Sequence, residues 1–392
     1  MNVQPDESDI EFKKLRWYYK YSFKKWKLIS NNKKSKRNTF AGVKGGQDNN
    51  IDTSVIIKQI PIHENNYAYV LKEVYFLACC KRNKYFIGII DAFLSEDCKN
   101  LYIIFRGEGS DLRDNIRFNK FNINDSIPNI SHIILFRIVS GLYILHKEDL
   151  SHNDIKLSNI ILSDNGSAKI CDMGSTDIIG KRKYGGTNGY SSPQCLLGRE
   201  RTKEDDMYSV GIVFLELLKN KNKLFYIPIP EQMQIEEENG NDILEKKNEY
   251  ITEKMLKKFY DIRYIGENVW NTGINYNIVI NQIKLGAYND FEFQLKDLEY
   301  FNNIDIQEKA LIRNLLEINP ANRKTAKQVL NLTMFKELNY NFINSKIDYS
   351  LEDYNKFFGK QIITQETFKK HFETIRQKFI DKEIFIKNII NE

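Results

Sequence analysis

The strongest constraint on the fold of this chain is a short polar insert between two apolar runs, LSHNDIKLSNIIL at residues 150–162. The insert presents Asp154, Lys156 and Asn159 within six residues, directly after the amphipathic stretch SHIILFRIVSGLYILH. A few residues later a second apolar run, AKICDMGST, delivers Asp172 into a turn. The chain must therefore place two polar turns beside a buried core.

These two turns carry residues that suit one kind of chemistry. Two carboxylates on consecutive loops, with an amide beside one of them, match the oxygen ligands that Mg²⁺ prefers. A positioned carboxylate can also orient a hydroxyl nucleophile. Phosphoryl transfer mainly needs orientation and charge neutralisation, so the pattern indicates that reaction class.

Length and cysteine usage limit the remaining choices. A chain of 392 residues can bury a large core and form one bilobal unit or two domains. The cysteines form no CxxC pair and no His-rich cluster, so neither a zinc site nor a disulfide framework is indicated, and an intracellular compartment, cytoplasmic or nuclear, is expected. The N-terminus MNVQPDESDIEFKK lacks a signal pattern, and no apolar run approaches the roughly 20 residues that cross a bilayer, so no transmembrane segment is expected.

Residue periodicity predicts a strand-rich first part and a helix-rich second part. Strands are expected at 18–29, 39–43, 53–60, 86–93 and 101–105. One helix is expected among them in NYAYVLKEVYFLACC, with Tyr67, Leu71, Val74 and Ala78 on one face and Glu73 beside it. Further helices are expected at 133–146, 204–218, 306–316 and 325–332. This order predicts an α+β fold of two lobes.

Several motifs carry a resemblance to a known family. HNDIKLSN resembles the catalytic loop of the eukaryotic protein kinase superfamily, and DMG resembles its metal-binding DFG turn. VIIK, ending at Lys58, resembles the strand that carries the family's nucleotide-binding lysine. GTNGYSSPQ resembles the end of the activation segment, and DMYSVG resembles the start of the buried helix that anchors this segment. NPANRKTAKQVL resembles the closing helices with their arginine, Arg323. The resemblance runs from about residue 27 to about residue 338 and implies the bilobal kinase fold.

The resemblance also implies a domain layout. We expect an N-terminal extension at 1–16, a small lobe at 17–106, a larger lobe at 107–338 with an insertion around 219–300, and a helical tail at 339–392. The insertion is a candidate docking site for a protein partner. For the tail, a solvated amphipathic helix is the favoured interpretation and packing on a lobe is the alternative.

Catalytic roles follow from the resemblance residue by residue. Asp154 would orient the substrate hydroxyl and accept its proton, and Lys156 would neutralise charge on the transferred group. Asn159 and Asp172 would hold Mg²⁺, with Mn²⁺ as an alternative. Lys58 would contact the α and β phosphates of ATP, kept in place by Glu73.

The same resemblance implies a nucleotide pocket and a substrate class. Val43 and Ile56 would lie above the adenine and Ile161 below it. Phe105 would be the gatekeeper, and Asp111 would lie near the ribose. The hinge would consist of Arg106, Gly107 and Glu108. Lys156 together with Thr187 resembles the serine/threonine-specific pattern, so the expected partners are protein substrates with serine or threonine hydroxyls. No nucleic-acid partner is expected, because the aromatic and basic stretch EFKKLRWYYKYSFKKWKLI is better explained by first strands with solvated lysines.

The phosphate loop departs from the family pattern. Counting back from Val43 places Phe40 at the loop tip and puts Lys36, Asn38 and Ala41 at the three glycine positions. Glycine permits close approach of backbone amides to phosphate. The substitutions therefore predict a weaker amide cradle; Lys36 or Arg37 could supply side-chain charge instead, or the stretch is only a basic surface turn.

Two further residues differ from the family pattern, and one cysteine is expected beside the nucleotide pocket. Asn153 replaces the arginine that pairs with an activation-loop phosphate, so activation by that phosphate is not encoded in the usual way. Gln194 replaces the glutamate that pairs with the arginine represented by Arg323, although an amide can still hydrogen-bond a guanidinium. Cys171 is expected to be a free thiol that lines the back of the nucleotide pocket and can react with an electrophile bound there.

Two rival functions remain at this stage. HND followed by Asn159 also resembles choline and aminoglycoside kinases, but those small-molecule kinases lack the GTxxYxxP segment and the DxxSxG helix that this chain has. A pseudokinase that serves as a scaffold or allosteric partner is favoured by the missing glycines. Retention of Lys58, Asp154, Asn159 and Asp172 favours an active enzyme.

Overall fold

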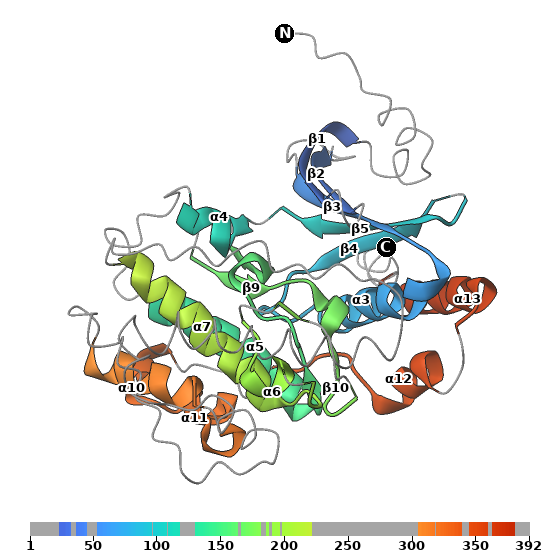
Figure 1. Ribbon diagram of the computed structural model, residues 1–392. Coiled ribbons are helices and arrows are strands. Elements are labelled where there is room, and N and C mark those ends of the chain that lie inside the picture. Colours follow the sequence, from blue (N-terminus) through green and yellow to red (C-terminus); the bar gives the residue numbers. More distant parts are fainter. Residues whose placement is uncertain are drawn as a thin grey trace, which may run out of the picture.

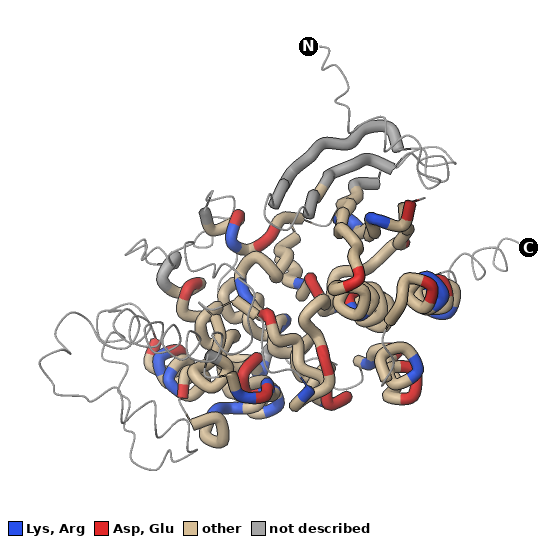
Figure 2. The backbone as a smooth tube through the Cα atoms, turned by 45° about the vertical axis from the view of Figure 1, so that its right-hand side comes forward, with Lys and Arg blue, Asp and Glu red and all other residues tan. Residues whose placement is uncertain are grey.

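The computed structural model describes residues 23–32, 37–44, 53–95, 97–107, 109–117, 130–163, 166–181, 186–187, 190–196, 198–221, 305–317, 319–338, 345–359 and 363–380. These residues form a strand-rich small lobe and a mostly helical large lobe (Figure 1). The predicted α+β bilobal fold is confirmed. Acidic and basic residues are interspersed along the described backbone of both lobes (Figure 2), which fits the modest net charge of +6.

The small lobe is built on an antiparallel sheet of five strands in the order β1-β2-β3-β5-β4. The strands are β1 (Phe23–Asn32), β2 (Arg37–Lys44), β3 (Thr53–Pro61), β4 (Ile89–Leu94) and β5 (Asn100–Arg106). β3 and β5 lie inside the sheet, and their β-branched and aromatic residues are largely buried. The strand expected at 86–93 begins only at Ile89, because Phe86 instead forms a bridge with Ile170 of the large lobe.

One long helix accompanies this sheet. A 3₁₀ turn (Glu64–Asn66) leads into α3 (Tyr67–Cys79), which lies under the sheet in Figure 1. The predicted apolar face of α3 is confirmed, since Tyr67, Leu71, Val74 and Ala78 are all buried. Glu73 on the same helix is also buried, so α3 carries a carboxylate into the interior between the lobes.

Two long helices organise the large lobe. α5 (Ile130–Lys147) lies against α7 (Lys203–Lys221), and α10 (Ile306–Leu315) and α11 (Ala326–Leu330) close the far side (Figure 1). The shorter described helices of this lobe are α4 (Leu112–Arg117) and α6 (Pro193–Leu196). Its 3₁₀ turns are at Leu157–Asn159, Met173–Ser175, Pro320–Asn322 and Thr333–Leu338. Capping boxes at Asp305 and Thr325 define where α10 and α11 begin.

The helix α5 is apolar around most of its circumference. By length and mean hydropathy it is the one helix among the described residues that could span a bilayer, but 67% of it is buried inside the protein. A helix that is hydrophobic all round normally occupies a core. The apolar character of α5 is explained by its position between α7, α11 and the short strands.

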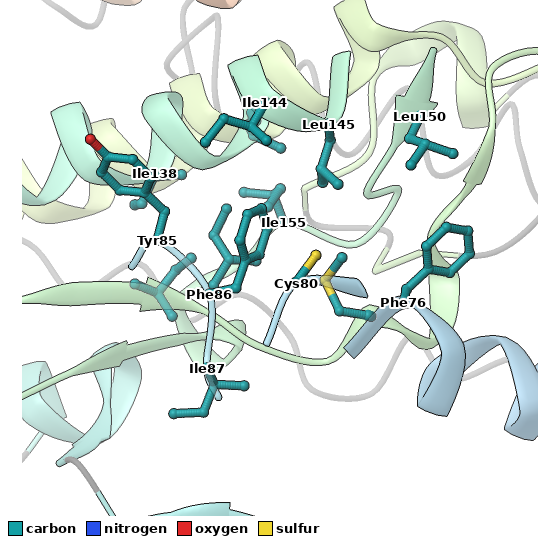
Figure 3. Packing of buried hydrophobic residues seen from close by; sticks show 14 of the residues in the cluster. Phe76, Cys80, Tyr85, Phe86, Ile87, Ile138, Ile144, Leu145, Leu150 and Ile155 are labelled. Atoms are coloured by element: carbon teal, nitrogen blue, oxygen red, sulfur yellow. The ribbon is translucent and has the colours of Figure 1, made fainter. Parts of the chain in front are cut away.

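Two small ladders place the catalytic segments on this core. β6 (Ser110–Asp111), β8 (Ile160–Leu162) and β9 (Ala168–Ile170) form one sheet, and β7 (Leu150–Ser151) pairs with β10 (Asp177–Ile178). Figure 3 shows Ile155 of the polar insert next to Phe86, below Ile144 and Leu145 of α5, with Phe76 of α3 on the other side. The insert is therefore fixed by apolar contacts to both lobes.

The C-terminal segment also has a defined place. It contains α12 (Leu351–Phe358), α13 (Gln365–Ile375) and a π-helical turn (Arg376–Ile380). Figure 1 shows α12 and α13 beside α3, and Tyr354, Phe357, Phe368 and Phe372 are buried there. The expectation of a solvated amphipathic helix is wrong, because the apolar face of this segment packs on the small lobe.

Candidate active site

The polar insert is held from below by one buried carboxylate on α7. Asp206 accepts hydrogen bonds from the backbone N–H groups of His152 and Asn153, both at 2.8 Å, and its Oδ2 lies 3.0 Å from Nε2 of His146. Burial alone would raise the pKa of Asp206, but the hydrogen bond and charge of His146, with His152, hold that pKa below its ordinary value. A carboxylate fixed in this way sets the backbone of residues 152–153, where Asn153 has a φ of 67°.

The structure brings four predicted catalytic side chains into one cluster. Lys156 Nζ donates to Asp154 Oδ2 at 2.7 Å and to Thr187 Oγ1 at 2.8 Å, and Thr187 Oγ1 donates to Asp154 Oδ1 at 2.8 Å. Asn159 Nδ2 donates to the Asp154 carbonyl at 2.8 Å and to its Oδ2 at 3.1 Å. These bonds fix the Asp154 carboxylate. Lys156 contacts its Oδ2, and the Thr187 hydroxyl donates to its Oδ1.

The two expected metal ligands lie on neighbouring ends of one hairpin. Asn159 precedes β8 and Asp172 follows β9, and the pairing of Ile160 with Ile170 puts these ends together. The Cys171 N–H donates to the Asn159 carbonyl at 2.9 Å. Because Asn159 Nδ2 is used by Asp154, its Oδ1 is the atom left for a metal, and an amide oxygen with a carboxylate suits Mg²⁺.

The expected ion pair across the small lobe is formed. Lys58 Nζ lies 2.5 Å from Glu73 Oε1 and 3.3 Å from Asp172 Oδ1. Burial alone would lower the pKa of Lys58, but the carboxylates of Asp172 and Glu73 outweigh burial and hold that pKa above its ordinary value. Lys58 is therefore a permanent cation that joins β3, α3 and the DMG turn.

A glycine allows α3 to approach that turn. A Cβ added at Gly174 would lie 2.4 Å from the Tyr69 hydroxyl and 3.2 Å from Glu73 Oε2, which is too close for a side chain at the first contact. A larger residue at this position would require the Tyr69 side chain to move. Gly174 thus lets the Tyr69 and Glu73 side chains of α3 lie close to the turn Met173–Ser175.

The expected nucleotide-pocket residues lie on adjoining strands. Ile56 is the cross-strand partner of both Ala41 and Phe105, and Arg106 follows Phe105 as an exposed residue at the end of β5. Asp111 pairs with Ile161, accepts a hydrogen bond from the Asp114 N–H at 2.9 Å, and has its pKa raised mainly by burial. Gly107 is half-buried between these strands, whereas Glu108 lies outside the described residues.

The phosphate loop differs from its expected geometry. The ladder pairs Asn32 with Arg37 and Leu28 with Phe40, so the turn between β1 and β2 falls at residues 33–36. Phe40 therefore lies within the strand pair and not at the loop tip, so that part of the prediction is wrong. Lys36 lies outside the described residues, as does the side chain of Val43, whose backbone pairs with Ser54.

The position of the missing family arginine is filled differently. Asn153 Nδ2 donates to the carbonyls of Ser151 and Ser175 at 3.1 and 3.0 Å, which joins the insert to the start of the segment after DMG. Buried Arg201 donates from Nη1 to the Asn153 carbonyl at 2.9 Å. Sequence reasoning did not find Arg201, because its signal is a single arginine between two motifs.

The Gln194–Arg323 contact is present. Arg323 Nη2 donates to Gln194 Oε1 at 2.6 Å, and its Nε donates to the Glu317 carbonyl at 2.6 Å. Its Nη1 lies 3.6 Å from Oδ1 of Asp205, a residue that sequence reasoning did not single out. The guanidinium therefore keeps a carboxylate partner although the usual glutamate is an amide.

Cys171 is free and half-buried beside these groups. Its carbonyl lies 3.3 Å from Nε2 of buried His152. Burial, with the nearby Asp172 carboxylate, raises the pKa of the Cys171 thiol well above its ordinary value. A strongly reactive thiol is thus not what the surroundings of Cys171 favour.

Comparison with known proteins identifies a family and several relatives. The model of the family described as "Protein kinase domain" matches residues 37–335. A probable serine/threonine-protein kinase, a KIN28 homolog of Encephalitozoon cuniculi (strain GB-M1), is 30% identical over 171 residues, which cover 42% of this chain and 54% of that protein. The serine/threonine-protein kinase pakB of Dictyostelium discoideum is 25% identical over 182 residues, 45% of this chain and 21% of that protein.

A third relative is the extracellular signal-regulated kinase 7 of Drosophila melanogaster, 22% identical over 273 residues, which cover 66% of this chain and 27% of that protein. The chain thus spans about half or less of the length of these relatives. The family model nevertheless covers most of the chain and both of its lobes. The chain belongs to the protein kinase domain family.

Proposed function

We propose that this protein transfers the γ-phosphoryl group of ATP to serine or threonine hydroxyls of protein substrates. The observation that carries the proposal is that Lys58 contacts Glu73 and Asp172 at 2.5 and 3.3 Å, in the same structure in which Asp154 contacts Lys156 and Thr187. The groups on both sides of the reacting phosphate are therefore arranged together. Phosphoryl transfer depends on this kind of pre-arrangement more than on covalent chemistry by the protein.

Each residue has a role in this proposal. Asp154 Oδ1, which now accepts the Thr187 hydroxyl at 2.8 Å, would accept the proton of the substrate hydroxyl in the same direction. Lys156, between Asp154 and Thr187, would stabilise negative charge on the transferred group. Lys58 would hold the α and β phosphates, since its cation is kept in place by Glu73.

The metal ligands would complete the site. Asn159 and Asp172 would hold Mg²⁺, which when bound supplies positive charge at the phosphate oxygens. The adenine would lie against Ile56, Phe105 and Ile161, and the cross-strand pair Ile56–Phe105 would narrow this space compared with a small residue in β3. We therefore expect the dissociation constant for ATP to differ from that of a routine protein kinase.

A scaffold function is the second candidate. The observation that favours it is the β1–β2 ladder, which includes Asn38 and Ala41, two of the three positions where the family has phosphate-binding glycines. A protein partner that docks on the insertion around 219–300 is compatible with both proposed functions. That insertion lies outside the described residues apart from its first residues in α7. An intracellular location is part of the proposal.

The test is phosphoryl transfer from γ-labelled ATP. The full chain is incubated with Mg²⁺ and casein or myelin basic protein, and the labelled amino acid is identified after hydrolysis. We expect phosphoserine or phosphothreonine. Lys58→Met removes the phosphate contact and should abolish transfer, whereas Lys84→Met, which replaces an exposed lysine over the Tyr85 ring, should leave transfer intact.

The assay is paired with a binding measurement. Thermal unfolding is followed with and without ATP and Mg²⁺ for the same three proteins. A thermal shift together with transfer supports the enzyme. Absence of both from the unaltered chain would reject the proposal in favour of the scaffold, because a bound ligand must raise the midpoint of unfolding.

A further inference from the structure

The C-terminal residues 345–359 and 363–380, the tail segment, cover the side of α3 that faces away from the catalytic cluster. The Asp348 N–H donates to the Cys79 carbonyl at 2.9 Å, and Asn83 Nδ2 donates to the Lys346 carbonyl at 3.1 Å. At its far end Arg376 lies 3.2 Å from Asp91 Oδ1 and donates to the Ala92 carbonyl of β4 at 3.1 Å. The segment is thus fixed at both ends to the small lobe.

Between these ends the contact is aromatic. Tyr67 near the start of α3 stacks on Phe368, with ring centroids 5.0 Å apart. Tyr75 lies 5.7 Å from Phe357 and 5.5 Å from Phe358, measured between centroids. Buried aromatic pairs stabilise beyond the area that they bury, and Tyr67, Tyr75, Phe357 and Phe368 are all buried, so this is an interior interface and not a surface contact.

One residue of the tail segment extends beyond α3. Tyr354 is buried, and its hydroxyl donates to Asp177 Oδ1 at 2.5 Å. Lys72 of α3 lies 2.5 Å from the other oxygen of Asp177 and 5.5 Å from the centroid of the Tyr354 ring. Asp177 therefore has a hydroxyl from the tail segment on one oxygen and a cation from α3 on the other.

This contact is connected to both halves of the active site. Lys72 directly precedes Glu73, the residue that holds Lys58 at 2.5 Å. Asp177 in β10 pairs with Ser151 in β7, which directly precedes His152 of the catalytic loop. The three side chains Tyr354, Asp177 and Lys72 thus join the tail segment, α3 and the catalytic loop at one point.

We propose that the tail segment is an intramolecular activator, in which Tyr354 is a positioning residue that holds α3 against the large lobe so that Glu73 reaches Lys58. The inference rests on the proposed function for its effect on catalysis, but the mechanical part stands on the contacts alone. Because the tie uses only unmodified side chains of this chain, it holds α3 without a partner protein and without a phosphate.

The test compares two hydroxyl deletions in the same aromatic cluster. Tyr354→Phe removes the bond to Asp177 and keeps the ring. Tyr349→Phe is the matched control, since among the described contacts Tyr349 has ring partners in Tyr75 and Phe76 but no hydroxyl hydrogen bond. Lys72→Met removes the other half of the tie and serves if Tyr354→Phe does not fold.

The first measurement is amide hydrogen exchange of the full chain. A hydrogen bond to a charged group contributes about 1.5 kcal/mol, so Tyr354→Phe should speed exchange in α3 about tenfold. Exchange in α5 and α7 should stay as in the unaltered chain, whereas a general loss of stability would speed exchange in all three helices. Equal exchange in α3 for Tyr354→Phe and Tyr349→Phe would overturn the proposal.

The second measurement is steady-state kinetics with ATP. We expect Tyr354→Phe to lower kcat about tenfold with a smaller change in the KM for ATP, because fewer molecules have Glu73 in place. An unchanged kcat would overturn the activating role. If the unaltered chain transfers no phosphate, the proposed function fails, while hydrogen exchange still decides whether the tail segment holds α3.

Discussion

The catalytic loop and the β1–β2 hairpin both carry residues of the proposed site but are built in different ways. The loop at residues 152–159 is fixed by buried groups, above all the Asp206 carboxylate that accepts two of its backbone N–H groups. The hairpin belongs to the outer edge of the sheet, and the glycines that would bring its backbone to a phosphate are replaced. The groups proposed to be catalytic are thus tightly held, whereas the proposed phosphate binding would depend on a strand pair with altered residues.

The largest effect should come from the loop. Asp154→Asn removes the proposed proton acceptor, and general-base catalysis contributes roughly 10²- to 10⁴-fold, so kcat should fall about 10³-fold. Asn is nearly isosteric, and with its Oδ1 toward the Lys156 and Asn159 donors its Nδ2 can donate to the Thr187 hydroxyl, so the fold should be kept. The measurement is the initial rate of transfer from γ-labelled ATP at saturating substrate.

A matched change checks that this loss is local. Asp149→Asn makes the same chemical change at an exposed aspartate, where φ is 53° and asparagine is well tolerated. Its kcat should equal that of the unaltered chain. If Asp154→Asn kept more than a tenth of the rate, Asp154 would not be the base.

The next effect concerns the support of the loop. Asp206→Asn turns one acceptor oxygen into a donor that faces a backbone N–H, so the free energy of unfolding should fall by about 3 kcal/mol. The measurement is urea unfolding at pH 7, with Asp149→Asn as the control. A loss under 1 kcal/mol would contradict the central place given to Asp206.

The same residue predicts a pH dependence. The pKa of Asp206 is lowered in the folded protein from the ordinary value of 3.8. Its contribution is therefore complete above pH 3.8 and is lost as the pH falls below that value toward the folded-state pKa. The difference in unfolding free energy between the unaltered chain and Asp206→Asn should shrink in that acid range, and a difference that grew there would contradict the assignment.

The sequence predicted the loop better than the hairpin for a physical reason. Asp154, Lys156 and Asn159 lie in one short turn, and the β8–β9 pairing brings Asp172 beside Asn159. Lys58 and Glu73 were assigned from the resemblance to the kinase family, which places them on a strand and on the following helix. The register of β1 on β2 depends on pairing across a turn, and for that reason the placement of Phe40 was wrong.

The tail segment shows the opposite limit of sequence reasoning. Its helical spacing was visible, but amphipathic spacing does not say which surface covers the apolar face. The partner surface is on α3, far earlier in the chain. The Tyr75 hydroxyl, for example, donates to the Ser350 carbonyl, and the two residues are 275 positions apart. Long-range contacts of this kind, like those of Arg201 with Asn153, have no local signal.

The hairpin can be tested by restoring its glycines. Lys36→Gly, Asn38→Gly and Ala41→Gly together should let backbone amides approach phosphate, and one added hydrogen bond to a charged group would lower the Kd for ATP about tenfold. Thr39→Gly in the same strand is the control, since it adds glycine at a position where the family has none. The measurement is calorimetric titration with ATP and Mg²⁺.

The result would sharpen the comparison directly. Tighter binding in the triple variant alone would show that the altered hairpin limits nucleotide affinity. Equal binding in the triple variant and the unaltered chain would show that Lys58 and the metal ligands already supply the affinity. In that case the weaker amide cradle predicted from the sequence would be wrong.

The smallest effect is expected at Cys171, which directly precedes Asp172. Because burial raises the pKa of Cys171, little thiolate is present near pH 7, so iodoacetamide should label Cys171 more slowly than the half-buried Cys98, which like Cys171 forms no disulfide. Labelling of Cys171 should keep rising with pH beyond the ordinary thiol value of 9.0. ATP with Mg²⁺ should slow Cys171 and leave Cys98 unchanged. A rate at Cys171 that levels off below that pH would contradict the raised pKa, and a rate that ATP does not change would place the thiol outside the proposed nucleotide pocket.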